Sequence, residues 1–160
     1  MINLKRLAGS QNVQRWEIEA NVVPTNDSAN FLVHSILSGY DQVVYVRMPQ
    51  VYGITLTTGH TVDGALAIGD DTFKTHATTI NAGEFIQFGT DTKVYLVTVG
   101  GASSIKIAPK LLKVVADNAA IKTGGAVTML ARYDTGVKLG ITYKDGVLSD
   151  PGSIRLIEAL

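Results

Sequence analysis

The chain contains no cysteine, and this absence excludes several kinds of protein at once. Without thiols there is no disulfide-stapled scaffold, no cysteine-ligated zinc site and no cysteine nucleophile. Charge is also scarce, because Asp, Glu, Lys and Arg make up 18% of the 160 residues and the formal net charge is zero. Backbone binding to nucleic acid depends on an excess of Lys and Arg, so we expect no nucleic-acid recognition. Low net charge leaves little repulsion between copies, which favours assembly with partners.

Long apolar runs are missing as well. Residues 1–7 include Lys5 and Arg6 but lead into the polar segment 8–12, which is not the pattern of a signal peptide. The longest apolar stretches elsewhere are a few residues long, far short of a membrane span. We therefore expect no targeting segment and no membrane insertion.

What the sequence does contain is a series of short strand patterns. Apolar residues make up 46% of the chain, enough for a core, and 160 residues predict a single domain over residues 1–160. Residues 14–22 alternate between an apolar set headed by Trp16 and a polar set, which predicts a strand with Trp16 in the core and one solvated face. Further strand patterns, bounded by Gly, Pro or Asp turns, cover residues 43–48, 84–88, 93–99, 104–107, 126–132, 137–143 and 154–160.

One helix is predicted between the first two strands, at roughly residues 27–38. Residues 25–28 offer N-cap oxygens, apolar residues follow at helical spacing, and Gly39 is well placed to end the helix. About eight short strands at hairpin spacing with one flanking α-helix predict a mainly β fold, an antiparallel barrel or sandwich. The Thr/Gly-rich stretch 51–79 gives a weaker pattern, which fits either short strands joined by turns or a long loop or excursion.

The three histidines give no metal-site pattern. His34, His60 and His76 lack the three- or four-residue spacing that places two imidazoles on one metal, and we interpret them as surface or loop residues. The sequence contains no nucleophile elbow, no zinc-protease helix motif and no phosphate-binding loop. We therefore predict that the protein is not an enzyme and has no catalytic, cofactor-binding or metal-binding residues.

Two pairs of carboxylates also have ordinary interpretations. Glu17 and Glu19 lie on the polar face of the first predicted strand, where we expect them to be solvated or to face a partner. Asp70 and Asp71 lie in a predicted turn, where Asp side chains cap their own backbone. Neither pair predicts a catalytic dyad or a cation site.

Six segments follow one another in a specific order: residues 14–18 (QRWEI), 82–89 (AGEFIQFG), 93–97 (KVYLV), 105–109 (IKIAP), 116–119 (ADNA) and 131–135 (ARYDT). Together with the helix after the first strand, this series resembles small structural proteins of tailed-bacteriophage tails and baseplates, of the distal-tail or tail-tube-like kind. In the last segment Tyr133 stands where that family has phenylalanine. The resemblance implies a small β-barrel or sandwich flanked by one helix and arranged with sixfold symmetry.

The function implied by this resemblance is structural. It is that of a virion protein, assembled in the host cytoplasm, which forms a ring with copies of itself and contacts neighbouring tail or baseplate proteins. A closed ring needs two different contact surfaces on each subunit, and residues 51–79 are either one of them or a plain surface excursion. A capsid decoration or head-to-tail connector protein is the first alternative. A carbohydrate- or ligand-binding β module is the second, with stacking platforms at Trp16, Tyr40, Tyr45 or Tyr52.

Overall fold

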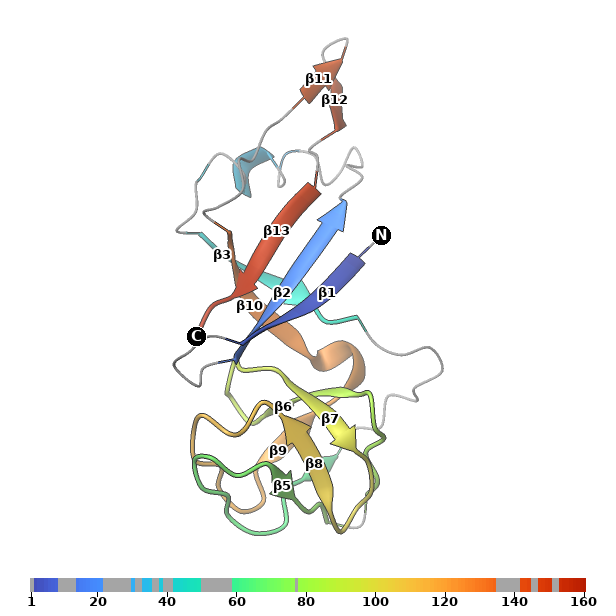
Figure 1. Ribbon diagram of the computed structural model, residues 1–160, viewed down its shortest axis with the longest axis vertical. Coiled ribbons are helices and arrows are strands. Elements are labelled where there is room, and N and C mark those ends of the chain that lie inside the picture. Colours follow the sequence, from blue (N-terminus) through green and yellow to red (C-terminus); the bar gives the residue numbers. More distant parts are fainter. Residues whose placement is uncertain are drawn as a thin grey trace. The chain divides into compact units, whose positions relative to one another are not determined.

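The computed structural model is mainly β, as the sequence predicts, and its strands pair in antiparallel fashion (Figure 1). It divides into two compact units: unit 1 comprises Met1–Val44 and Leu130–Ala159, and unit 2 comprises Tyr45–Met129 and Leu160. The structure describes residues 2–8, 14–21, 30, 33–35, 38, 42–49, 59–76, 78–134, 142–144, 147–150 and 153–160.

Unit 1 is built around a five-stranded antiparallel sheet with the strand order β1-β2-β13-β10-β3. Strand β2 lies between β1 and β13, and Ile18 lies opposite Leu4 on one side and opposite Leu156 on the other. Both crossings of the chain between the two units fall inside strands of this sheet, one in β3 and one in β10. The bounds are β1 Ile2–Ala8, β2 Gln14–Asn21, β3 Val43–Arg47, β10 Thr128–Tyr133 and β13 Ser153–Glu158.

The apolar residues of β2 pack as the alternation predicts. Trp16 and Ile18 are buried together with Ile154 and Leu156 of β13, which confirms Trp16 as a core residue. The polar set behaves differently, because Glu17 is 1% exposed, and the expectation that it is solvated is wrong. Its charge is met by Arg155 of the neighbouring strand, which lies directly opposite Glu19 and diagonally to Glu17.

The predicted helix is present in the described part of segment 27–38. Asn30 and residues 33–35 are α-helical, and the backbone N–H of Ser38 donates to the carbonyl of His34 over 2.9 Å. Ser35 is buried, and its Oγ lies 2.6 Å from the hydroxyl of Tyr133. This hydrogen bond ties the helix to β10 inside unit 1.

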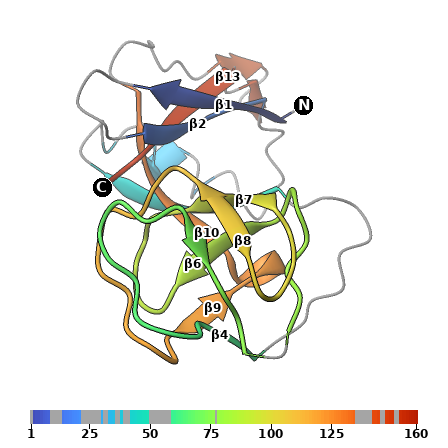
Figure 2. The same ribbon diagram turned by 60° about the horizontal axis from the view of Figure 1, so that its bottom comes forward.

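Unit 2 contains a six-stranded antiparallel sheet with the order β4-β9-β6-β7-β8-β5, which curls into a half-barrel (Figure 2). The predicted strands at residues 84–88 and 93–99 pair as a hairpin, with Phe85 opposite Leu96 and Ile86 opposite Tyr95. A short 3₁₀ helix, η1 (Gly124–Ala126), precedes β10. The bounds are β4 His60–Thr61, β5 Thr72–Phe73, β6 Phe85–Phe88, β7 Tyr95–Val99, β8 Ile105–Ala108 and β9 Ala120–Lys122.

The curled sheet encloses one cluster of buried apolar side chains. At its centre the Phe88 ring makes edge contacts with Phe73 at 5.2 Å and with Tyr95 at 5.5 Å between ring centroids. These contacts join the edge strand β5 to the interior strands β6 and β7. The members of the cluster are Val62, Leu66, Phe73, Ile80, Ile86, Phe88, Tyr95, Val97, Ile105, Ile107, Leu111, Val115 and Ile121.

A close backbone approach fixes one corner of this unit. Ile80 and Gly101 form a two-way bridge, with N···O distances of 3.0 and 2.9 Å. A Cβ atom at the preceding residue, Gly100, would lie 2.6 Å from the nitrogen of Ala82 and 2.7 Å from the oxygen of Ile80. Glycine is therefore required at position 100 by space rather than by backbone conformation.

Each of the eight predicted strands corresponds to an observed strand, and the structure describes five more, namely β1, β4, β5, β9 and β12 (Val147–Asp150). Strand β11 (Thr142–Lys144) pairs with β12; residues 137–141 of its predicted range lie outside the described residues. No described helix is long and apolar enough to cross a membrane.

The expectation of a loop or excursion at residues 51–79 is corrected over its described part. Residues 59–76 contain β4 and β5 and place Val62, Leu66 and Phe73 in the core. The alternative of short strands joined by turns is the one observed here. The segment 51–58 lies outside the described residues.

Candidate functional site

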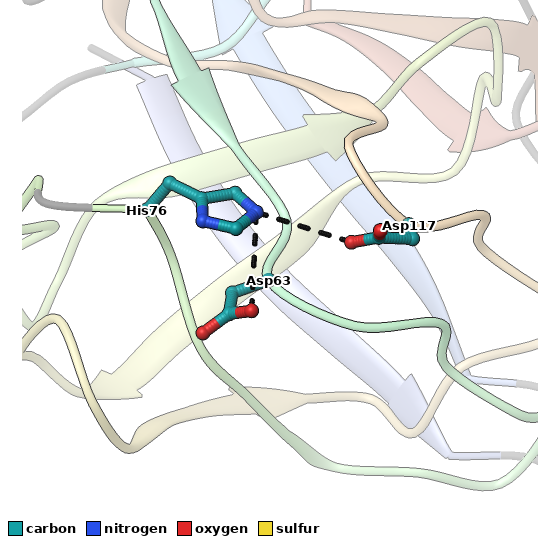
Figure 3. A group of neighbouring side chains, drawn as sticks. All are labelled: Asp63, His76 and Asp117. Carbon is teal, nitrogen blue, oxygen red and sulfur yellow. Dashed lines mark ion pairs between the residues drawn. The ribbon is translucent and has the colours of Figure 1, made fainter.

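Three polar side chains meet at the surface of unit 2 (Figure 3). The Nε2 atom of His76 lies 3.8 Å from Oδ1 of Asp63 and 3.9 Å from Oδ1 of Asp117. One ligand atom from each residue lies within 4.8 Å of the others. The side chains are about half exposed, at 46% for His76, 50% for Asp63 and 53% for Asp117, so both solvent and ions can reach them. We call these residues the Asp63–His76–Asp117 cluster.

The backbone of Val62 positions the two acidic residues of the cluster. Its N–H donates to the carbonyl of Ala119 and its carbonyl accepts from the N–H of Asn118, both over 3.0 Å. Because its side chain is fully buried, Val62 holds this junction against the core. Asp63 follows Val62 in the chain, and Asp117 precedes Asn118. The two acidic residues therefore lie beside each other at the surface.

A second ladder brings His76 to the same place. Val62 forms an antiparallel bridge with Thr75, and the N–H of His76 donates to the carbonyl of Thr61 over 3.2 Å. Side chains alternate along each segment, so Val62 and Thr75 point inward while Asp63 and His76 point outward. Three chain segments thus contribute one side chain each to the cluster.

The carboxylate of Asp117 is held in a fixed orientation. Its Oδ1 accepts hydrogen bonds from the backbone N–H of Gly64 over 2.8 Å and of Asn118 over 2.9 Å, and its Oδ2 accepts one from Nδ2 of Asn118 over 2.9 Å. Asn118 adopts a positive φ of 60°, a conformation that asparagine tolerates better than most residues. The turn at Asp117–Asn118 therefore aims the carboxylate at His76.

The donor set of the cluster suits a cation. Two carboxylates and one imidazole carry a charge of −2 when the imidazole is neutral and −1 when it is protonated. A protonated His76 can pair with both acids, and a neutral His76 can join them as a nitrogen ligand to a divalent metal ion.

Comparison with known proteins does not assign this arrangement to a family. No protein-family model matches the chain, and none of the curated proteins matches its sequence. The resemblance to bacteriophage tail proteins therefore rests on the six sequence segments and their order.

Two of the three histidines are exposed as predicted, and the third is buried. His34 is exposed on the helix, as expected, and His76 is exposed in the cluster. His60 is 2% exposed, so its interpretation as a surface or loop residue is wrong. It shares the inward face of its segment with Val62, and its Nδ1 is buried without a hydrogen-bond partner. The cluster could not be predicted from metal-ligand spacing along the sequence, because its residues come from three segments. The Asp-Gly pair at residues 63–64 and the Asp-Asn pair at residues 117–118 do indicate turns that expose an aspartate.

The two predicted aspartates of the turn make different local hydrogen bonds. Oδ2 of Asp70 accepts from the backbone N–H of Ala67 over 2.7 Å, and Oδ1 of Asp71 accepts from Oγ1 of Thr72 over 3.0 Å. The first hydrogen bond confirms Asp70 as a backbone cap of its turn, whereas Asp71 bonds a neighbouring side chain and is not shown to cap the backbone.

A surface pocket of about 260 Å³ also lies in unit 2. Lys113 and Asp91 pair beside it, with 2.9 Å between Nζ and Oδ1. Its aromatic residue, Phe88, is buried in the core and offers no exposed stacking face. The lining residues are Phe88, Gly89, Thr90, Asp91, Lys113, Val114, Val115, Ala116 and Ala119.

Unit 1 contains a second group of charges, centred on the buried Glu17. Nε of Arg155 donates to Oε1 of Glu17 and lies 3.4 Å from Oδ2 of Asp134. The hydrogen bond to Glu17 is the main reason why the pKa of Arg155 is raised above its ordinary value. Oε2 of Glu17 is buried and has no hydrogen-bond partner among the described residues, and Arg155 is the described cation beside this carboxylate.

The variant Arg155→Leu is expected to lower the urea midpoint of unfolding, because it leaves the Glu17 carboxylate buried without its cation. The double variant Glu17→Leu/Arg155→Leu is expected to recover most of that loss, since an apolar pair needs no charge compensation. Circular dichroism during urea titration measures both. A double variant no more stable than Arg155→Leu would contradict the assignment of the loss to the uncompensated Glu17.

Proposed function

We propose that this protein is a structural subunit of a bacteriophage tail or baseplate, which assembles into a ring with copies of itself and with neighbouring tail proteins. The six segments that resemble this family support the biological setting, and five of them overlap strands in chain order, namely β2, β6, β7, β8 and β10. The low net charge supports assembly. The absence of enzymatic activity stays a prediction.

The observation that carries the proposed assembly is the exposed strand β3. It is the last strand at one edge of the five-stranded sheet, and none of its five residues is buried. Val43 is 44% exposed and Tyr45 is 72% exposed, although valine and tyrosine favour strands with at least one covered face. An apolar edge strand offers backbone hydrogen bonds and apolar contacts to another strand, and proteins otherwise protect such edges.

The partner we propose for β3 is the edge strand β1 of a second copy. Strands β3 and β1 are the two edges of one sheet, so they are different surfaces of the same subunit. A contact from the β3 edge of one copy to the β1 edge of the next is heterologous, and heterologous contacts close into rings when the rotation between subunits allows it.

The variant Tyr45→Lys is expected to reduce the assembled fraction strongly, because it places a charge on the edge that pairs. The matched control is Val114→Lys, since Val114 is 73% exposed and lies in a loop rather than on an edge strand. Light scattering on a sizing column measures the mass of each variant, and negative-stain microscopy shows whether rings form. A wild-type protein that stays monomeric at all concentrations, joins no neighbouring tail protein and is missing from purified virions would refute the proposal.

The alternatives differ in location and ligand. Immunogold label on the phage head would favour a capsid decoration or connector protein. For a carbohydrate-binding module, the buried Trp16 offers no platform, Tyr40 and Tyr52 lie outside the described residues, and Tyr45 has the required exposure. Glycan-array binding that is lost in Tyr45→Ala would favour that alternative over the tail proposal.

A further inference from the structure

We propose that Asp63, His76 and Asp117 form a binding site for a divalent transition metal ion of the zinc class. This inference is independent of the assembly proposed above, because it concerns a cluster within unit 2 alone. Its basis is the combination of one imidazole nitrogen and two carboxylate oxygens that three different chain segments bring together.

The distances leave room for an ion at the centre of the cluster. Zinc binds nitrogen and oxygen at about 2.0–2.2 Å, so two ligands in tetrahedral geometry are separated by about 3.4 Å. The Nε2 atom of His76 lies 3.8 and 3.9 Å from the two carboxylate oxygens, too far for direct hydrogen bonds and slightly wider than the zinc-bound spacing. Movements of less than about 1 Å in half-exposed side chains would bring all three ligands into bonding distance.

The charge of a divalent ion matches the two carboxylates of the cluster. Each of the two carboxylates has His76 as its ion-pair partner, and a single proton on the imidazole leaves one negative charge uncompensated. A divalent ion compensates both carboxylates while the imidazole stays neutral. Lys74 lies opposite Asp63 in the backbone ladder, but the described contacts include no ion pair between them.

The surroundings hold one of the three ligands, Asp117, as outer-shell groups do in metal sites. Both oxygens of Asp117 accept hydrogen bonds, and the two backbone donors to Oδ1 belong to Gly64 and Asn118. Such hydrogen bonds fix the orientation of a ligating carboxylate before the metal arrives. The backbone of Val62 joins the segments that supply all three ligands, so the preorganisation does not depend on the metal.

The donor set also selects the class of ion. Imidazole nitrogen suits zinc, nickel and copper, whereas calcium and magnesium prefer six or more oxygen ligands. Three protein ligands leave a fourth tetrahedral position, which a water molecule fills. Bound zinc would link the segments that contain Asp63, His76 and Asp117 and would stabilise unit 2.

Isothermal titration calorimetry of the untagged protein with zinc chloride, and separately with calcium chloride, tests the proposal. We expect one zinc ion per chain, much weaker calcium binding, and a thermal midpoint that rises with zinc concentration. The variants His76→Gln, Asp63→Asn and Asp117→Asn should each weaken zinc binding about tenfold or more. Asn at position 117 still accepts the backbone hydrogen bonds, so this variant separates charge from folding.

Two further variants make the result decisive. His34→Gln replaces an exposed histidine in unit 1 and should bind zinc like the wild type. Lys74→Gln removes a like charge beside the site and should bind zinc more tightly, a gain that misfolding does not produce. The proposal is overturned by wild-type affinity in His76→Gln, by calcium binding as tight as zinc binding, or by no binding at millimolar zinc.

Discussion

The Phe88→Ala variant is expected to lower the free energy of unfolding by about 3–5 kcal/mol, the range for removing a large buried aromatic side chain. Phe88 is buried in the core cluster of unit 2, with its ring against Phe73 and Tyr95. Truncation removes both aromatic contacts and leaves a cavity. The backbone hydrogen bonds of β6 to its neighbouring strands limit how far the core can close around it. Phe88→Leu keeps much of the volume and should cost less than half as much.

Urea titration with two probes measures this loss and also tests the single-domain prediction for residues 1–160. Trp16 is the one tryptophan of the chain and lies in the core of unit 1, so its fluorescence reports on that unit. Circular dichroism follows the strands of both units. For one cooperative domain, Phe88→Ala lowers both midpoints together. A fluorescence midpoint that stays at its wild-type value would show that the units unfold as separate domains.

The Gly100→Ala variant is expected to destabilise the protein by about 3 kcal/mol, the upper end for overpacking a well-packed site. Its Cβ would lie 2.6 Å from the nitrogen of Ala82 and 2.7 Å from the oxygen of Ile80. Both are backbone atoms, so no side-chain rotation relieves the contact. Relief requires the bridge between Ile80 and Gly101 to open.

Gly125→Ala is the matched control, because a Cβ at that position meets no atom within 4 Å. Its effect should stay within about 0.5 kcal/mol, as for most surface substitutions. Thermal and urea midpoints compare the two variants directly. Equal midpoints for Gly100→Ala and Gly125→Ala would show that the backbone at residues 80–82 moves freely, contrary to the packing described.

Strand length explains only part of what the sequence predicted, because β1 has seven residues and was missed while β11 has three and was predicted. β2, β7 and β10 each have five or more residues, and their apolar positions mark them clearly. β4, β5 and β9 have two or three residues, too few for alternation to be recognised. Their pairing depends on partners far away in the chain, such as His60 opposite Ile121. Short strands of a curled sheet are therefore a property of the tertiary fold rather than of local sequence.

Burial of polar groups was the least predictable feature. Alternation assigned Glu17 to a wet face, but Arg155, more than a hundred residues later, supplies the cation that makes its burial tolerable. The Asp63–His76–Asp117 cluster has the same origin, because bridges at Val62 bring three segments together. Each ligand looked ordinary in its own segment. Only the register of the ladders makes them neighbours.

The position of the chain crossings bears on how this protein can evolve. The chain enters unit 2 within β3 and leaves it within β10, and these two strands are adjacent in one sheet. Residues 45–129 therefore begin and end side by side, which is the geometry in which insertions of whole modules are tolerated. The segment also supplies residues 45–47 of β3 and residues 128–129 of β10, so we expect a change in its length to be tolerated only where these two strands keep their pairing.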